Sequence, residues 1–297
     1  MRLRTLAILA LVLIVSGCMG VPDNRSKNKE SSPSDANDSV SEAVLDEKTF
    51  LLLGVDSRGE ASSRSDAILL ARYDEKQKII KLASIMRDSY VEIPGYKLNY
   101  NKINMAYYLG GSDLLKKTIY DNFHIKVDHV AIIDFNGFVK LIDLLSPEGI
   151  KVDVKPEMIE DMTIEASKGE NVLHGEEILK YVRFRHDSES DFGRVKRQQE
   201  VLVQLKEKVV ERLSSVEGVA AMPHVLGEAR SLIDTDIGMK PLIEIGTSLL
   251  FNPIDEVETL RIPVEGSYTD ETYPHSGAVL ELDKEKNQAA LQEFIER

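Results

Sequence analysis

The hydrophobic positions of this chain form two kinds of run, one typical of buried strands and the other of helices. Mostly continuous apolar runs, as in strands buried on both faces, lie at 49–55, 67–73, 79–86 and 128–134. Helical spacing predicts helices near 112–123, 136–145, 175–184, 192–214, 222–232, 238–251 and 285–296. Strands that alternate with helices predict an α/β fold, in which helices cover both faces of a mixed central β-sheet.

The segment before the first strand has two parts of different composition. Arg2 and Arg4 precede an apolar stretch that is shorter than the roughly 20 residues of a membrane-spanning helix, and Val15-Ser16-Gly17-Cys18 follows it. This pattern predicts a signal peptide over 1–17, and its end resembles the lipobox of bacterial lipoproteins, which predicts lipidation of Cys18. Residues 18–48 are polar and predict a disordered tether, which leaves 49–297 as one folded domain.

Composition and charge exclude several classes of protein. The 297 residues are 42% hydrophobic, and 37 basic against 50 acidic side chains give a net charge of −13. A body this acidic repels nucleic-acid phosphates, so nucleic acid is not an expected partner. The single cysteine excludes an internal disulfide. No G-x-x-x-x-G-K-[ST] motif occurs, so ATP is not the evident donor.

Charged residues follow the predicted strands. Asp56 and Asp66 flank the loop between the first two strands, and such a pair suits Mg²⁺, although two solvated loop acids would have the same spacing. Arg87 follows the third strand, where ligands collect in open α/β sheets. Lys102 stands at the start of a further predicted helix. Asp134, at the end of the fourth strand, fits a helix cap.

Basic residues are densest at 181–199, which has a local net charge of +2 from five basic and three acidic residues. Arg183 and Arg185 lie in this segment. In an extended backbone the two side chains point the same way, whereas in a helix they diverge. The pair alone therefore does not define a pocket.

The helix that follows gives a clearer indication. Its apolar stripe runs through Val201, and stepping back by three or four residues puts Gln198, Arg197 and Arg194 on the same inward face. Buried arginines at a helix N-terminus predict a polar pocket that holds an anion such as a diphosphate. The alternative is that these arginines reach out and pair with carboxylates such as Asp191.

Taken in order, these segments make the chain resemble the LytR-CpsA-Psr family. The resemblance covers 49–297, and its last block is quite specific. The blocks are G-V-D-S-R at 54–58, R-S-D at 64–66, I-M-R-D at 85–88, N-K-I-N-M-A-Y at 101–107, V-R-F-R at 182–185 and D-F-G-R-V-K-R-Q at 191–198.

The resemblance implies a function at the outer face of the cell membrane of a Gram-positive bacterium. Members of the family transfer glycopolymers, such as wall teichoic acid or capsule, from a polyprenyl pyrophosphate carrier to peptidoglycan. The implied fold holds the polyprenyl chain in an apolar groove between sheet and helices. Most members have a transmembrane helix where this chain has the lipobox, so the implied membrane anchor here is the lipid on Cys18.

The resemblance also assigns roles to individual residues. Asp56 and Asp66 would hold Mg²⁺ or Mn²⁺ against the pyrophosphate, and the implied catalytic set is Asp56, Asp66, Arg87 and Asp191. The residues implied to bind pyrophosphate oxygens, with Asp191 and Arg197 in support, are Arg64, Arg87, Lys102, Arg183, Arg185, Arg194, Arg197 and Gln198.

Two other functions compete with the transferase. A hydrolase could use the same site to cleave prenyl pyrophosphates with water, and an acceptor sugar would then not raise turnover. A non-catalytic lipoprotein could bind glycopolymers or regulate wall metabolism, and it would tolerate the loss of Asp56 and Asp66.

Overall fold

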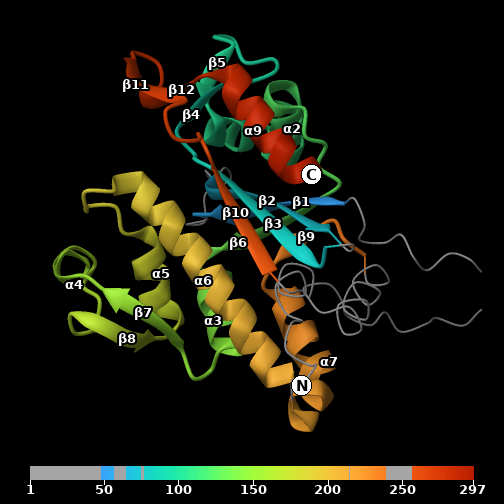
Figure 1. Cartoon of the computed structure of the whole chain (residues 1–297), viewed down its shortest axis with the longest axis vertical. Coiled ribbons are helices and arrows are strands. Elements are labelled where there is room, and N and C mark those ends of the chain that lie inside the picture. Colours follow the sequence, from blue (N-terminus) through green and yellow to red (C-terminus); the bar gives the residue numbers. More distant parts are fainter. Residues whose placement is uncertain (1–47, 57–64, 75–76, 214, 239–255) are drawn as a thin grey trace, which may run out of the picture.

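A computed structural model describes residues 48–56, 65–74, 77–213, 215–238 and 256–297 of the chain (Figure 1). The predicted signal peptide, the tether, Cys18 and Arg64 lie outside these residues, as does nearly all of the helix predicted at 238–251.

The centre of the fold is a six-stranded mixed sheet with the strand order β10-β3-β2-β1-β6-β9. In β1, Phe50 packs into the hydrophobic cluster on one side of the sheet, and its neighbours Leu51 and Leu53 pack into the cluster on the other side. The four apolar runs are therefore strands buried on both faces, as predicted. The strands are β1 (Thr49–Val55), β2 (Ser65–Asp74), β3 (Ile79–Ile85), β6 (His129–Asp134), β9 (Asp234–Thr235) and β10 (Glu256–Ile262).

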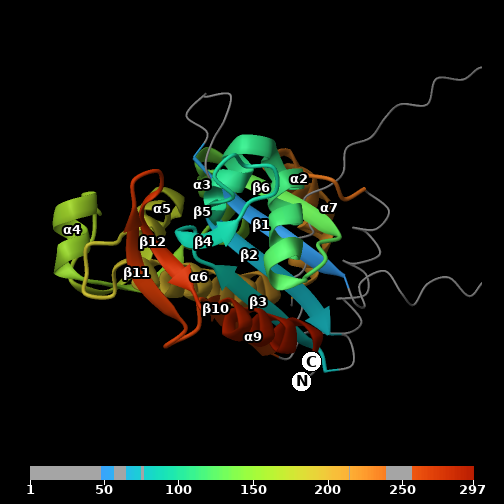
Figure 2. The same ribbon diagram turned by 90° about the horizontal axis from the view of Figure 1, so that it is seen from above.

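Helices cover both faces of this sheet (Figures 1 and 2). On one face lie α3 (Phe135–Leu145), α5 (Gly175–Arg183), α6 (Ser190–Leu213) and α7 (Val216–Ser231), and on the other lie α2 (Ile103–Phe123) and α9 (Lys284–Glu296). This arrangement confirms the predicted fold class. Among the described residues, none of the helices has both the length and the apolar character needed to cross a bilayer.

Helix α2 begins earlier than the predicted 112–123. It starts at Ile103, directly after Lys102, and is interrupted at Gly110 and Gly111, which have non-helical backbone angles. The φ of Gly111 is +62°, a conformation that favours glycine. Lys102 therefore precedes the first turn, as its position in the sequence indicates, and the glycine pair divides the helix into two segments.

The smaller elements were not predicted. A second sheet has the order β11-β12-β4-β5, and β7 and β8, which are joined through α4, form an antiparallel pair before α5. Their sequences are short or largely polar, so they lack continuous apolar runs. These elements are β4 (Ser89–Glu92), β5 (Tyr100–Lys102), β7 (Ile150–Val154), α4 (Pro156–Met162), β8 (Gly169–Leu173), β11 (Tyr268–Tyr273) and β12 (Gly277–Leu282).

Gly137, in the first turn of α3, packs tightly against the end of α7. A Cβ atom there would lie 2.5 Å from the carbonyl oxygen of Leu232, whereas a Cβ on Gly227 of α7 would meet nothing within 4 Å. We expect Gly137→Ala to lower the free energy of unfolding by about 1–3 kcal/mol through overpacking. Gly227→Ala serves as the control and should be neutral or stabilising by up to about 1 kcal/mol. Urea denaturation of both variants measures this, and equal stability of the two would contradict the packing.

Candidate functional site

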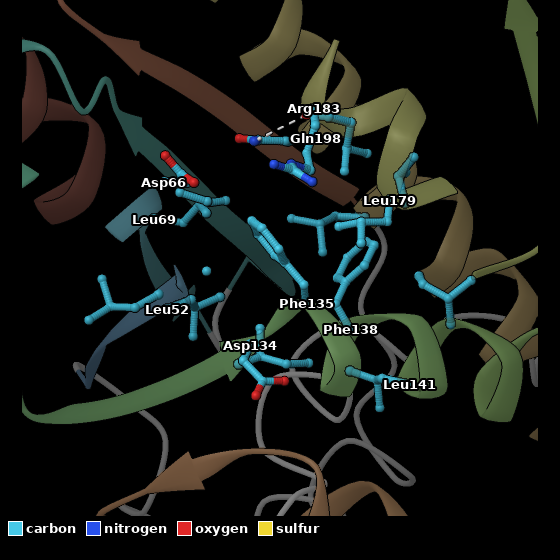
Figure 3. Close-up of a pocket in the computed structure, with 18 of the residues that line it drawn as sticks. Leu52, Asp66, Leu69, Asp134, Phe135, Phe138, Leu141, Leu179, Arg183 and Gln198 are labelled. Atoms are coloured by element: carbon cyan, nitrogen blue, oxygen red, sulfur yellow. Dashed lines mark hydrogen bonds between the residues drawn. The ribbon is translucent and has the colours of Figure 1, made fainter. Parts of the chain in front are cut away.

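A cavity of about 230 Å³ lies between the central sheet and helices α3, α5 and α6 (Figure 3). Most of its wall is apolar, with contributions from both the strands and the helices. The apolar lining includes Leu52, Leu53, Leu69, Ala131, Ile133, Phe135, Phe138, Leu141, Ile142, Leu179, Val182, Val201, Leu202, Leu205 and Ile233.

Most of the charged groups of this cavity lie at one end, and Asp134 lies at the other (Figure 3). Figure 3 shows Asp66, Arg183 and Gln198 together, on the opposite side of the cavity from Leu141. The charged lining consists of four arginines and two aspartates, so the wall has a positive balance in an acidic chain. These residues are Asp66, Arg87, Asp134, Arg183, Arg185 and Arg194. We call the group of Asp66, Arg87, Arg183, Arg185, Arg194 and Gln198 the arginine mouth.

Arg87 connects the arginine mouth to the second sheet through a series of ion pairs. Its Nη1 binds Oδ1 of Asp66, and its Nε lies 3.5 Å from Oδ2 of Asp88. Nζ of Lys102 lies 2.7 Å from the other oxygen of Asp88. Burial alone would lower the pKa of Arg87, but the carboxylates of Asp66, Asp88 and Asp191 raise it above its ordinary value. Arg87 therefore stays a cation. Lys102 contacts Asp88 but is not part of the cavity lining.

Arg194 places a second charge inside the protein. Its side chain is only 5% exposed, and its Nη2 donates to Oδ2 of Asp191 at 2.9 Å. Burial lowers its pKa to about 10, because the carboxylates of Asp191 and Asp66 do not offset both desolvation and the nearby Arg87 and Arg185. Its Nε is buried and has no hydrogen-bond partner among the described residues. An anion in the cavity would supply the missing partner and charge.

The inward face predicted for α6 is confirmed, since Arg194 and Arg197 are 4% and 5% exposed. The alternative pairing is also present, because Arg194 binds Asp191 while it remains buried.

Arg183 and Arg185 both line the cavity because the backbone changes conformation between them. Helix α5 ends at Arg183, and Phe184 has φ −59° and ψ 140°, which is extended. The Phe184 side chain is buried, so the arginines on either side of it both face the mouth. The guanidinium of Arg183 also lies 4.3 Å from the centre of the Phe135 ring. This aromatic contact fixes Arg183 at the boundary between the charged and apolar parts of the cavity.

Arg197 is not part of the cavity lining. Its Nη1 donates to Oδ2 of Asp187 at 2.9 Å, and its Nη2 donates to the carbonyl oxygen of Phe184 at 2.5 Å. Lys155 binds the same Asp187 oxygen at 3.2 Å. Arg197 thus connects α6 to the segment that carries Arg185, and it stabilises the arginine mouth without lining the cavity. The sequence analysis assigned no role to Asp187 or Asp88, although each stands within two residues of a predicted site arginine.

Asp134 caps α3, as predicted. Its Oδ1 accepts from the backbone N–H of Gly137 at 2.7 Å, and its side chain also contributes to the cavity wall.

Comparison with known proteins assigns this arrangement to a family, since residues 16–291 match the LytR_cpsA_psr family. The chain belongs to the LytR-CpsA-Psr family. It is 38% identical to the regulatory protein MsrR of Staphylococcus aureus over 248 residues, which are 84% of this chain and 74% of MsrR. It is 30% identical to the polyisoprenyl-teichoic acid–peptidoglycan teichoic acid transferase TagT of Bacillus subtilis over 277 residues, covering 86% of this chain and 83% of TagT.

Solved structures of the family share the fold. A structure of TagT with bound octaprenyl pyrophosphate lipid matches with a TM-score of 0.61 at 27% identity, over 90% of this chain and all of that one. The family therefore includes teichoic acid transferases, and its fold is the mixed α/β arrangement described above.

The family resemblance implies a bound metal ion. The carboxylates near the arginine mouth show whether such an ion fits there. Asp56 directly follows β1 and Asp66 belongs to the adjacent antiparallel β2, so both lie near the same end of the paired strands. No cluster of three or more His, Cys, Asp or Glu side chains that could hold a metal occurs in the described part of the chain. A pair of carboxylates nevertheless fits Mg²⁺, which takes its remaining ligands from water and substrate phosphates.

The Asp187–Arg197 pair makes stability depend on pH. Burial of Asp187 is outweighed by hydrogen bonds from Arg197 and Lys155, which lower its pKa. Its contribution to stability is therefore complete above its unfolded pKa of about 3.9 and is lost as the pH falls through the lowered folded pKa. We expect Asp187→Asn to lower the free energy of unfolding by about 3 kcal/mol at pH 7, because Arg197 loses its counter-charge.

Urea denaturation at neutral pH and near pH 3 tests this expectation. The difference between the wild-type protein and Asp187→Asn should shrink in acid, and a difference that is independent of pH would contradict it. Asp161→Asn, which removes an exposed partner of His186, is the control and should have little effect at neutral pH.

Proposed function

We propose that this protein transfers a glycopolymer from a polyprenyl pyrophosphate carrier to a hydroxyl group of peptidoglycan. The observation that carries the proposal is the combination of an arginine mouth with a long apolar wall in one cavity. A lipid pyrophosphate has the same two parts, an anionic head and an apolar tail. The similarity to TagT, which is named as a transferase of this class, supports the same reaction.

In the proposed reaction, a peptidoglycan hydroxyl oxygen attacks the phosphorus that bears the glycan. The bond from that phosphorus to the bridging oxygen breaks, and polyprenyl phosphate leaves. Arg87 and Arg194 bind the phosphate oxygens and stabilise the charge that develops on the leaving group. The hydroxyl proton passes to a carboxylate at the mouth, for which Asp56 and Asp191 are the two candidates.

Asp56 and Asp66 would hold Mg²⁺ or Mn²⁺ beside the pyrophosphate. Such an ion, when bound, would neutralise phosphate charge. Asp66 also orients Arg87, and Asp191 orients Arg194. The carboxylates thus position the cations whether or not a metal is bound.

The proposed location is the outer face of a bacterial cytoplasmic membrane, with the lipid on Cys18 as the anchor. From there the cavity reaches lipid carriers in the same membrane and peptidoglycan outside it. Loss of the chain from the membrane fraction on Cys18→Ser substitution tests the anchor.

The arginine mouth predicts which substitutions abolish transfer. Arg87→Ala and Asp66→Ala should each lower the release of polyprenyl phosphate by about 10²-fold or more, because charge stabilisation at the transferring group is lost. Release from a synthetic lipid-pyrophosphate glycan is measured with the full chain, with and without Mg²⁺ and peptidoglycan fragments. Full activity in both folded variants would rule out the assignment.

The same assay separates the rival functions. A transferase releases polyprenyl phosphate faster when peptidoglycan fragments are present, and a hydrolase releases it at the same rate without them. The regulatory name of MsrR favours a binding role as the second candidate, and absence of any release together with retained lipid binding would support it.

The apolar wall predicts a dependence on prenyl length. Ala131 is buried in β6 and lines the cavity, so Ala131→Leu should narrow it. We expect binding of octaprenyl pyrophosphate to weaken by about tenfold or more through steric overlap. Geranyl pyrophosphate, which is short, serves as the control ligand and should bind with unchanged affinity. An equal loss for both ligands would indicate damage to the mouth and contradict the proposed tail site.

A further inference from the structure

A cluster of aromatic side chains lies on the outward face of the second sheet, outside the cavity. Tyr90 of β4 stacks on Tyr273 of β11, with ring centres 4.7 Å apart and planes 19° apart. Tyr100 of β5 lies 5.7 Å from Tyr90, and His275 lies beyond the end of β11. Glu281 of β12 is the register neighbour of Tyr90. We call Tyr90, Tyr100, Tyr273, His275 and Glu281 the tyrosine face (β4, β5, β11 and β12 in Figure 1).

The tyrosine face is open to solvent, since Tyr90 and Tyr273 are half-buried and Tyr100 is exposed. Tyr100 is 40% exposed, whereas Val91 and Leu280, on the opposite side of the same sheet, are buried. Stacked aromatic rings that are not needed to fill a core leave flat apolar surface available to a ligand.

Polar groups surround these rings. The hydroxyl of Tyr273 donates to the carboxylate of Glu281, and the hydroxyl of Tyr90 lies 3.2 Å from Nε2 of His275. Tyr90, Tyr100, Glu281 and Lys284 line a second cavity of about 260 Å³ beside the rings. Flat rings with carboxylate and hydroxyl groups at their edges match a sugar, whose C–H groups pack on aromatic faces and whose hydroxyls form hydrogen bonds.

The tyrosine face is continuous with the arginine mouth. Tyr90 follows Arg87 by three residues, so their Cα atoms are within about 10 Å of each other. Lys102 is directly opposite Tyr90 on β5, and it binds Asp88, which contacts Arg87. A polymer on the tyrosine face can therefore present one of its hydroxyl groups at the mouth.

The charged side chains on this side of the second sheet discriminate between the donor glycopolymer and the peptidoglycan acceptor. By the alternation of side chains along paired strands, Glu92 and Glu271 lie on the same side of the sheet as Glu281. These three carboxylates outnumber Lys102 and Lys284 at the same face, and Lys102 is already paired with Asp88, so the face repels a polymer that carries phosphate groups, such as a teichoic acid. The amino-sugar backbone of peptidoglycan carries no phosphate, and its muramyl carboxyl groups are held in amide bonds to the peptides, so the backbone itself meets no such repulsion.

We propose that the tyrosine face binds the glycan strand of the peptidoglycan acceptor and holds it beside the arginine mouth. The inference rests on the proposed transferase function for its biological meaning. The binding itself is a separate property of the tyrosine face and can be measured alone.

The experiment uses isothermal titration to measure how tightly the full chain in detergent binds peptidoglycan chains that keep their peptides but carry no wall polymer. The variant Tyr100→Ala/Tyr273→Ala should bind the glycan at least about tenfold more weakly, because two stacking surfaces are removed. Tyr108→Ala is the matched control, since Tyr108 is a tyrosine on α2 whose 41% exposure matches that of Tyr100, and it should leave binding unchanged. Tyr100→Phe/Tyr273→Phe keeps the rings and should retain most of the affinity.

Octaprenyl pyrophosphate binding is measured on the same samples and should not change, which also shows that the variants fold. The proposal is overturned if the wild-type protein does not bind the glycan or if the alanine pair binds it with normal affinity. It is also overturned if the alanine substitutions weaken the binding of a phosphate-bearing donor polymer and not that of the glycan. Failure of the transferase proposal has a different signature, namely no acceptor-stimulated release of polyprenyl phosphate while tyrosine-dependent glycan binding persists.

Discussion

Burial of arginine charge at the edge of an apolar cavity constrains the whole site, because a guanidinium leaves water only where carboxylates or a bound anion offset its desolvation. Packing of the apolar stripe of α6 against the sheet brings Arg194 inside, where it is 5% exposed. Asp191 holds this arginine, and Asp66 holds Arg87 from the sheet side. The contacts that stabilise the fold therefore also deliver and orient the cations for an anionic ligand.

Helical periodicity was sufficient to place the two arginines of α6 inside the protein, but it could not distinguish their roles. Arg194 faces the cavity, whereas Arg197 turns to Asp187 and the Phe184 carbonyl. That choice depends on how the segment between α5 and α6 folds back, which residue spacing does not encode. For the same reason, residue spacing does not decide whether the side chains of Arg183 and Arg185 point the same way. The extended backbone of Phe184 places both at the mouth.

The sequence predicted four of the six central strands because both their faces are buried. It missed β9, which has two residues, and β10, in which polar and apolar residues alternate, and it missed the second sheet because most of its outward positions are polar. β11 exposes most of its side chains, and β5 has only three residues. The rings of Tyr90, Tyr100 and Tyr273 come from three separate segments, so only the strand pairing brings them together. A surface assembled in this way carries no motif in the sequence.

The two surfaces differ in charge and lie close together, and salt limits the reach of each surface's field to about 8 Å in physiological solution. The arginine mouth has a positive balance in a chain of net charge −13, and the tyrosine face bears carboxylates. An anionic donor is thus attracted only at the mouth, and its polymer is repelled from the tyrosine face. The space beside the mouth stays available to the uncharged amino-sugar backbone of peptidoglycan, so the charge pattern favours the acceptor over a donor polymer at that place.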